Sequence, residues 1–174
     1  TIRSELENWA RIHTAGIRRM PHLNDRSATR RIKIGYLSPD FRSHSVAYFL
    51  EPLLESHDRD RFEVYCYSEV KNPDAVTRRF EKIADRWRVT HGVSDDETAA
   101  LIQNDRIDVL VDCVGHTQGD RVFVLARKPA PVQVATLIGY EATTGLAAMD
   151  YLLGDPFLTP QGFEAHFSET LVRL

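Results

Sequence analysis

An acid and an imidazole lie four residues apart in one polar segment of this chain. Asp40 and His44 fall within residues 35–44, GYLSPDFRSH, which begin in an apolar run typical of a buried strand. An imidazole titrates near neutrality, so His44 can accept or donate a proton, and Asp40 can orient it. The alternative interpretation is that Asp40 caps a turn and that His44 is a half-buried polar residue.

Two further polar loops follow apolar runs in the same way. One reads VGHTQGDR and holds His116, Thr117 and Gly119. The other reads IGYEATTG and holds Gly139, Tyr140 and Glu141. Glycines in these loops permit a tight backbone approach to a ligand. Each loop alone could be an ordinary solvated turn, and it is the recurrence at three places that indicates a site.

Apolar segments and helical patterns alternate along most of the chain, and this rhythm positions the three loops. The predicted strands are 32–37, 62–68, 88–90, 109–114, 132–138, 151–153 and 171–174. The predicted helices are 46–57, 75–86, 95–104, 120–126 and 160–167. Continuous apolar strands joined by helices favour an α/β fold with a doubly wound, Rossmann-like, mostly parallel sheet. The three loops would then open on one crevice.

Helix starts and an amino-terminal appendage complete this scheme. An amphipathic helix is predicted over residues 4–19, and we divide the chain into a helical connector and linker, 1–31, and a Rossmann-like domain, 32–174. Ser43 or Ser45 is expected to cap the helix after His44, leaving its N–H groups as an anion-binding end. Two other starts are predicted, a capping box at Ser94 and Glu97 and a helical first turn at Thr159 and Pro160.

Composition limits the class of protein. The 174 residues are 43% apolar and 27% charged, which suits one soluble globular domain, and Cys66 and Cys113 are expected to be buried thiols. The net charge of −3 argues against a nucleic acid partner. No apolar run approaches the ~20 residues that span a bilayer, and no signal peptide opens the chain, so we expect no membrane association and a cytoplasmic location.

Several familiar motifs are missing from the sequence. There is no G-x-G-x-x-G after the first strand, no G-x-x-x-x-G-K-[ST] and no G-x-S-x-G, and the histidines lack zinc-ligand spacing. These absences disfavour dinucleotide-dependent, nucleotide-hydrolysing and zinc-dependent chemistry. The sequence therefore predicts no cofactor and no metal.

Taken together, the loops resemble the catalytic region of the O-linked N-acetylglucosamine transferases and their SPINDLY-like relatives. The matching words run in the family's order and span residues 32–174. They are GYLSPDFRSH at 35–44, RFEVYCYS at 61–68, VDCVGHTQG at 111–119, RKPAPVQV at 127–134 and ATTGLAAMDY at 142–151.

The resemblance implies a GT-B enzyme of which this chain is the amino-terminal half, truncated at both ends. It implies an inverting, metal-independent transfer of GlcNAc from UDP-GlcNAc to Ser or Thr hydroxyls of a polypeptide acceptor. The residues it implies as catalytic are His44 and Asp40. Those it implies as substrate-binding are Ser45, His116, Thr117, Gly119, Gly139, Tyr140 and Glu141.

Two departures from the family's pattern leave alternatives open. Ser45 follows His44 where the family commonly has proline, and Glu141 stands where a Gly-Tyr-Pro word is usual. The alternatives are a GDP-fucose donor, as in SPINDLY-type enzymes, and a non-catalytic protein-interaction module. In every case the resemblance implies upstream tetratricopeptide repeats and a missing carboxyl-terminal half. An isolated fragment is expected to be inactive, and it could dimerise through its exposed face.

Overall fold

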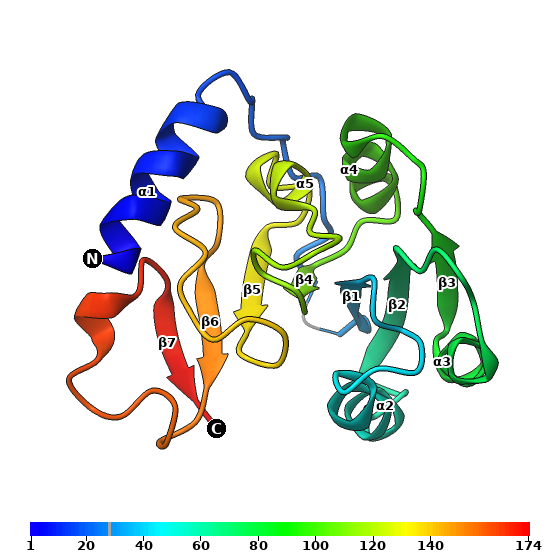
Figure 1. Ribbon diagram of the computed structural model, residues 1–174. Helices are drawn as coiled ribbons and strands as arrows, with labels where there is room; N and C mark the ends of the chain where they lie inside the picture. The colour runs from blue at the N-terminus through cyan, green and yellow to red at the C-terminus, as the bar shows by residue number, and fades with distance from the viewer. Residues whose placement is uncertain (28) are drawn as a thin grey trace.

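The computed structural model describes residues 1–27 and 29–174 and is built on one seven-stranded sheet (Figure 1). Residue 28, inside the predicted linker, lies outside the described residues. The strands are β1 (Ile32–Ser38), β2 (Phe62–Ser68), β3 (Arg86–Val89), β4 (Val109–Asp112), β5 (Val132–Thr136), β6 (Tyr151–Gly154) and β7 (Thr170–Arg173). They pair in the order β3-β2-β1-β4-β5-β6-β7, and every pairing is parallel. The predicted Rossmann-like α/β fold is confirmed.

Helices cover both faces of this sheet. They are α1 (Ile2–His13), α2 (Ala47–Glu55), α3 (Ala75–Ile83), α4 (Asp95–Asn104) and α5 (Val122–Ala126). In Figure 1, α2 and α3 lie on one face, and α1, α4 and α5 lie on the other. This is the doubly wound arrangement that right-handed crossovers produce. Among the described residues, no helix is long and apolar enough to cross a membrane.

The alternation of side chains along the strands divides the apolar interior into two cores. Leu37 and Leu110 pack into the core under α1, α4 and α5. Their neighbours Tyr36 and Val111 pack into the core under α2 and α3. Successive strand residues point to opposite faces, so two covered faces need continuous apolar runs. Cys66 and Cys113 lie in the second core as buried free thiols, as predicted, and burial raises the pKa of both.

Three helix predictions are wrong in extent. Residues 160–167 form only a 3₁₀ turn, Glu164–His166, because Gly162 has a φ of +91°, which a right-handed helix cannot include. The first helix ends at His13, where the Thr14 hydroxyl bonds the Ala10 carbonyl at 2.7 Å. The helix predicted over 75–86 ends at Ile83, since β3 begins at Arg86.

The amino-terminal helix packs closely on the body of the protein. Ala10 of α1 is 4% exposed, and Trp9 packs against the same core. At Gly145, which has a φ of +70°, an added Cβ would lie 2.5 Å from the carbonyl carbon of Leu6. A side chain at residue 145 would therefore push α1 away. The division of the chain at residue 31 remains a prediction.

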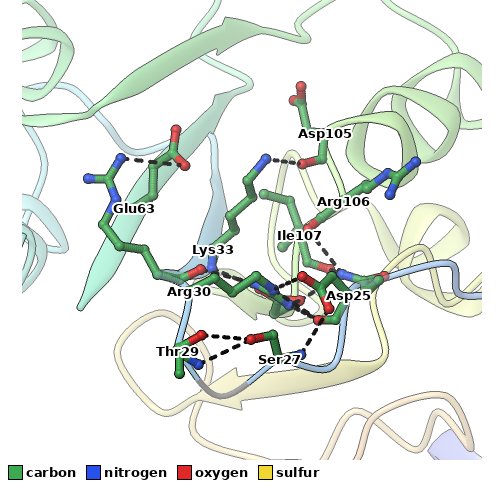
Figure 2. Close-up of polar contacts among 12 residues, drawn as sticks. Asp25, Ser27, Thr29, Arg30, Lys33, Glu63, Asp105, Arg106 and Ile107 are labelled. Atoms are coloured by element: carbon green, nitrogen blue, oxygen red, sulfur yellow. Dashed lines mark hydrogen bonds and ion pairs between the residues drawn. The ribbon is translucent and has the colours of Figure 1, made fainter. Parts of the chain in front are cut away.

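A cluster of polar contacts fixes the linker to the amino edge of the sheet (Figure 2). Arg30 donates from Nη1 and Nη2 to both carboxylate oxygens of Asp108, at 2.6 and 2.7 Å. The Asn24 side chain and the Lys33 backbone N–H donate to the same carboxylate at 2.8 and 2.9 Å. Burial opposes ionisation of Asp108, but these hydrogen bonds hold its pKa below the ordinary value. Asp108 thus ties the linker to β1 and β4.

Candidate functional site

A cleft of about 630 Å³ lies at the carboxyl edge of the sheet. Its walls come from the loops after β1, β2, β3, β4 and β5, as expected for parallel strands that end at one edge. The predicted site residues that line it are Asp40, His44, Thr117, Gly119 and Gly139. The loops after β1, β4 and β5 therefore come together as predicted.

Asp40 and His44 both line this cleft and lie close to each other. Asp40 is 8% exposed, and its backbone N–H donates to the Ser38 hydroxyl at 3.0 Å. One carboxylate oxygen accepts from Arg42 at 3.1 Å, and the other lies 3.6 Å from Nδ1 of His44. A separation of 3.6 Å is too long for a hydrogen bond, so the pair is in proximity but not engaged.

The ring nitrogens of His44 have distinct surroundings. Nδ1 accepts a hydrogen bond from the backbone N–H of Val46 at 3.3 Å. An accepting Nδ1 leaves the proton of a neutral ring on Nε2. For Nε2 to act as a base, the proton must be on Nδ1, and closing the gap to Asp40 would stabilise that tautomer. A ring movement that shortens the 3.6 Å separation between Nδ1 and the Asp40 carboxylate would therefore make His44 a base oriented by that carboxylate.

Asp74 shapes the turn that carries this pair. Its Oδ2 accepts from the Ser43 N–H at 2.8 Å, while Oδ1 accepts from the Thr77 N–H at 2.9 Å and caps α3. Hydrogen bonds from the backbone of Ser43, and then of Thr77, lower the pKa of Asp74. One carboxylate therefore joins the start of α3 to the turn before His44.

The prediction that a serine caps α2 is wrong. The helix begins behind Val46 without a side-chain cap, and Ser45 is exposed and does not line the cleft. The Ser43 N–H is already used by Asp74. The backbone donors near α2 are thus occupied by His44 and Asp74 side chains, which fix the turn.

A buried carboxylate supports the loop after β4 from below. Asp112 is 2% exposed and accepts from the N–H groups of Gly115 at 2.9 Å and Val114 at 3.3 Å. Burial raises the pKa of Asp112 to about 7, even though these two hydrogen bonds act to lower it. The Thr117 hydroxyl donates to the Val114 carbonyl at 3.1 Å, which closes the loop on itself.

His116 lies behind the cleft wall and does not line the cleft itself. Its Nε2 is 2.7 Å from the carbonyl of Thr144, and a carbonyl only accepts, so Nε2 carries a proton. The ring packs edge-on against Trp9 and Tyr140, with centroids 5.5 and 5.6 Å away. His116 therefore joins the loop after β4 to the loop after β5 and to α1.

The loop after β5 divides between two sites. Gly139 reaches the cleft, and an added Cβ there would lie 2.3 Å from the Cys113 carbonyl oxygen, so only glycine fits. Tyr140 packs behind the cleft on His116. Glu141 is exposed in a separate hollow beside α1. Ser45, His116, Tyr140 and Glu141, which were predicted to bind substrate, therefore do not line the cleft.

The sequence did not predict the part of the cleft that is formed by the loops after β2 and β3. Glu69, Lys71 and Asn72 follow β2, and His91 follows β3, and all of them line the cleft. The signal was available, because EVKNPD follows the predicted strand 62–68 directly. These residues add the ends of β2 and β3 to the three strand ends that the sequence predicted.

The fold and this cleft define a class: a Rossmann-like α/β domain with a polar site at its carboxyl edge and an acid beside a histidine. Comparison with known families is specific. The chain belongs to glycosyl transferase family 41, whose family model matches residues 6–174. The resemblance found in the sequence is confirmed.

Individual relatives agree with this assignment. The chain is 41% identical over 155 residues to a protein from Oryza sativa named a probable UDP-N-acetylglucosamine–peptide N-acetylglucosaminyltransferase SPINDLY, covering 87% of this chain and 17% of that protein. It is 33% identical over 146 residues to the Caenorhabditis elegans UDP-N-acetylglucosamine–peptide N-acetylglucosaminyltransferase, covering 81% and 12%.

A solved structure matches the whole fold. A mutant of the Thermobaculum terrenum O-GlcNAc transferase superposes with a TM-score of 0.92 and 43% identity, over 99% of this chain and 33% of that chain. The chain thus spans a third of the solved relative and about one sixth of the rice relative.

Proposed function

We propose that this chain is one wall of the active site of a protein O-linked N-acetylglucosaminyltransferase. The observation that carries the proposal is the Asp40–His44 pair in a cleft of a domain that belongs to glycosyl transferase family 41. The named relatives act with UDP-N-acetylglucosamine on peptides. The substrates of the parent protein are then UDP-GlcNAc and a Ser or Thr hydroxyl of a polypeptide.

The proposed reaction is a single displacement. The acceptor oxygen bonds to C1 of GlcNAc while the bond from C1 to the diphosphate oxygen breaks, so UDP leaves with the bonding electrons and the configuration inverts. The acceptor proton must pass to a base. His44 is the proposed base, with Asp40 stabilising the resulting imidazolium. Arg42 donates a hydrogen bond of 3.1 Å to Asp40 and orients that carboxyl.

The isolated chain is proposed to be inactive. Positioning of two reactants supplies on the order of 7–11 kcal/mol of the barrier in well-oriented reactions, and it needs both walls of a cleft. This chain covers 33% of the solved transferase. The remaining wall, upstream tetratricopeptide repeats and a cytoplasmic location are part of the proposal for the parent protein.

The proposal is tested on the parent protein by calorimetry with UDP-GlcNAc, UDP and GDP-fucose, followed by transfer to an acceptor peptide. We expect binding of UDP-GlcNAc by the parent and none by this chain alone. Binding of GDP-fucose alone would replace the donor, and binding of no nucleotide sugar would favour a non-catalytic interaction module.

Replacement of the proposed base tests the mechanism itself. In the parent, His44→Ala should lower kcat by about 10²–10⁴-fold, the usual contribution of general base catalysis, with little change in UDP-GlcNAc affinity. His57→Ala is a matched control, because that imidazole bonds Tyr36 on the α2 side and is absent from the cleft lining. Equal activity of the two variants would contradict the assignment.

A further inference from the structure

The cleft wall opposite the predicted site is held together by one arginine. Arg121 donates from Nη1 to Asp95 and from Nη2 to Glu69, each at 2.7 Å. Nη2 also lies 2.8 and 2.9 Å from the carbonyls of Thr90 and Val93. Its side chain is 14% exposed. Arg121 therefore connects the ends of β2, β3 and β4, and it orients the Glu69 carboxylate.

Glu69 is next to the Asp40 turn and on the surface of the cleft. Its backbone N–H donates to the Ser38 carbonyl at 3.0 Å, and the Ser38 hydroxyl accepts from Asp40 N–H. The Glu69 side chain is 6% exposed. It lines the cleft with Lys71 and His91. Glu69 and Asp40 both bond to Ser38, so the Glu69 carboxylate lies on the residue next to the turn that carries the proposed catalytic pair.

One oxygen of this carboxylate has no partner. Oε2 is bound by Arg121, but Oε1 is buried and accepts no hydrogen bond from any of the residues that the structure describes. Buried carboxylate oxygens are normally satisfied, because leaving one unpaired destabilises the folded protein. Asp95 pairs with the same arginine at the same distance, yet it is 30% exposed and does not line the cleft.

We propose that Glu69 is a substrate-binding residue. When a substrate occupies the cleft, the Glu69 side chain turns toward it, and Oε1, which is buried in this structure, accepts a hydrogen bond from a hydroxyl or amide N–H of that substrate. The inference rests on the proposed transferase function. An ionised carboxylate can only accept, so it selects an O–H or N–H donor, while Lys71, Asn72 and His91 offer donors to the oxygens of the same group. Both the sugar of the nucleotide donor and the main chain of the acceptor carry such groups.

The test compares two carboxylates that share one arginine. Glu69→Gln and Asp95→Asn are made in the parent protein, and KM is measured separately for UDP-GlcNAc and for an acceptor peptide. A glutamine at 69 turns its amide oxygen to Arg121 and its NH₂ toward the cleft, which replaces the acceptor by a donor. We expect Glu69→Gln to raise KM for one substrate about tenfold, and Asp95→Asn to change either KM by less than about twofold.

The outcomes separate this inference from the proposed function. A higher KM for UDP-GlcNAc identifies the sugar as the partner of Oε1, and a higher KM for the peptide identifies the acceptor. If Glu69→Gln and Asp95→Asn change both KM values equally, Glu69 only supports Arg121 and the inference is wrong. Melting temperatures of both variants show whether folding is affected. If the wild-type parent binds no nucleotide sugar, the proposed function fails and this inference fails with it.

Discussion

The acidic side chains of this protein differ in how fully their oxygens are used. Asp108 accepts from Arg30, Asn24 and Lys33, so both of its oxygens are satisfied, and the Arg30 guanidinium binds both. Asp112 accepts only backbone N–H groups, and the charged side chains that act on it are the acids Asp120 and Glu169. Ionised Asp108 therefore stabilises the fold, whereas ionised Asp112 destabilises it.

This contrast predicts opposite pH dependences. The folded pKa of Asp112 is raised, so its contribution is fully favourable below the unfolded value near 3.9 and is lost as pH rises through about 7. Asp112→Asn removes the penalty of ionisation. We expect the variant to gain stability relative to wild type between pH 5 and pH 8, by an amount on the order of a few kcal/mol. Urea unfolding at a series of pH values measures it.

Asp108→Asn is the matched control with the opposite sign. Its folded pKa is lowered, so its stabilisation is present above the unfolded value and is lost as pH falls through the folded one. The variant should lose stability at pH 8 and approach wild type in acid. A parallel pH dependence for the two variants would contradict the assigned states of both carboxyls.

Part of the site was predictable from residue types alone. Asp40 and His44 are close in sequence, and one turn keeps them together, so their proximity required no knowledge of the fold. Glu69 and His91 are brought to the cleft only by the pairing of β2 with β1 and of β3 with β2. The turn that leaves Ser45 exposed is fixed by the Asp74 carboxylate, which accepts from the Ser43 N–H, and sequence spacing does not encode this contact.

At the scale of elements, buried parallel strands were the most predictable feature. Their two covered faces require continuous apolar runs, as in 62–68, which matches β2 at both ends. The prediction for 160–167 was wrong because Gly162 adopts a φ of +91°, and Arg173, on β7, binds the Pro160 carbonyl from outside the segment. Tertiary contacts from distant residues of this kind override a local helical pattern.

The contact between α1 and the loop after β5 gives a test of element packing. Gly145→Ala would place a Cβ 2.5 Å from Leu6, at a φ of +70°. We expect a loss of about 3 kcal/mol or more in unfolding free energy, from backbone strain together with overpacking. Chemical denaturation measures the loss.

Gly92 provides the control for backbone strain alone. Its φ is +81°, but a Cβ there would meet nothing within 4 Å. Gly92→Ala should therefore cost only the left-handed backbone conformation, about 1 kcal/mol. Equal losses for the two variants would mean that α1 yields to the new methyl group without cost.

At the scale of the whole molecule, the walls of the cleft are the loops that follow the strands of the sheet. Next to these loops, α2 exposes apolar side chains to solvent. Tyr48 is 83% exposed and Phe49 is 62% exposed, directly after the turn that carries His44. Large apolar side chains gathered on one surface usually mark an interaction site. We expect this surface to meet the rest of the parent protein.

The chain in isolation is expected to dimerise at high concentration through this surface. Light scattering over a range of concentrations should show a rising mass for the wild type. The double variant Tyr48→Ser and Phe49→Ser should remain monomeric, while Phe157→Ser, at a residue 93% exposed beyond β6, should behave as wild type. A wild-type chain that stays monomeric at millimolar concentration would contradict the expectation.

The cluster at the amino edge of the sheet has a consequence for genetic variation in this family. Both oxygens of the Asp108 carboxylate accept hydrogen bonds from Arg30. Substitutions at Asp108 or Arg30 should therefore destabilise the fold and reduce the amount of protein in a cell. The opposite edge keeps unused hydrogen-bonding capacity at Glu69 and His44, where substitutions should spare abundance and reduce turnover. If cellular abundance and turnover are both measured for such variants, those at Asp108 and Arg30 should lower abundance, and those at Glu69 and His44 should lower turnover.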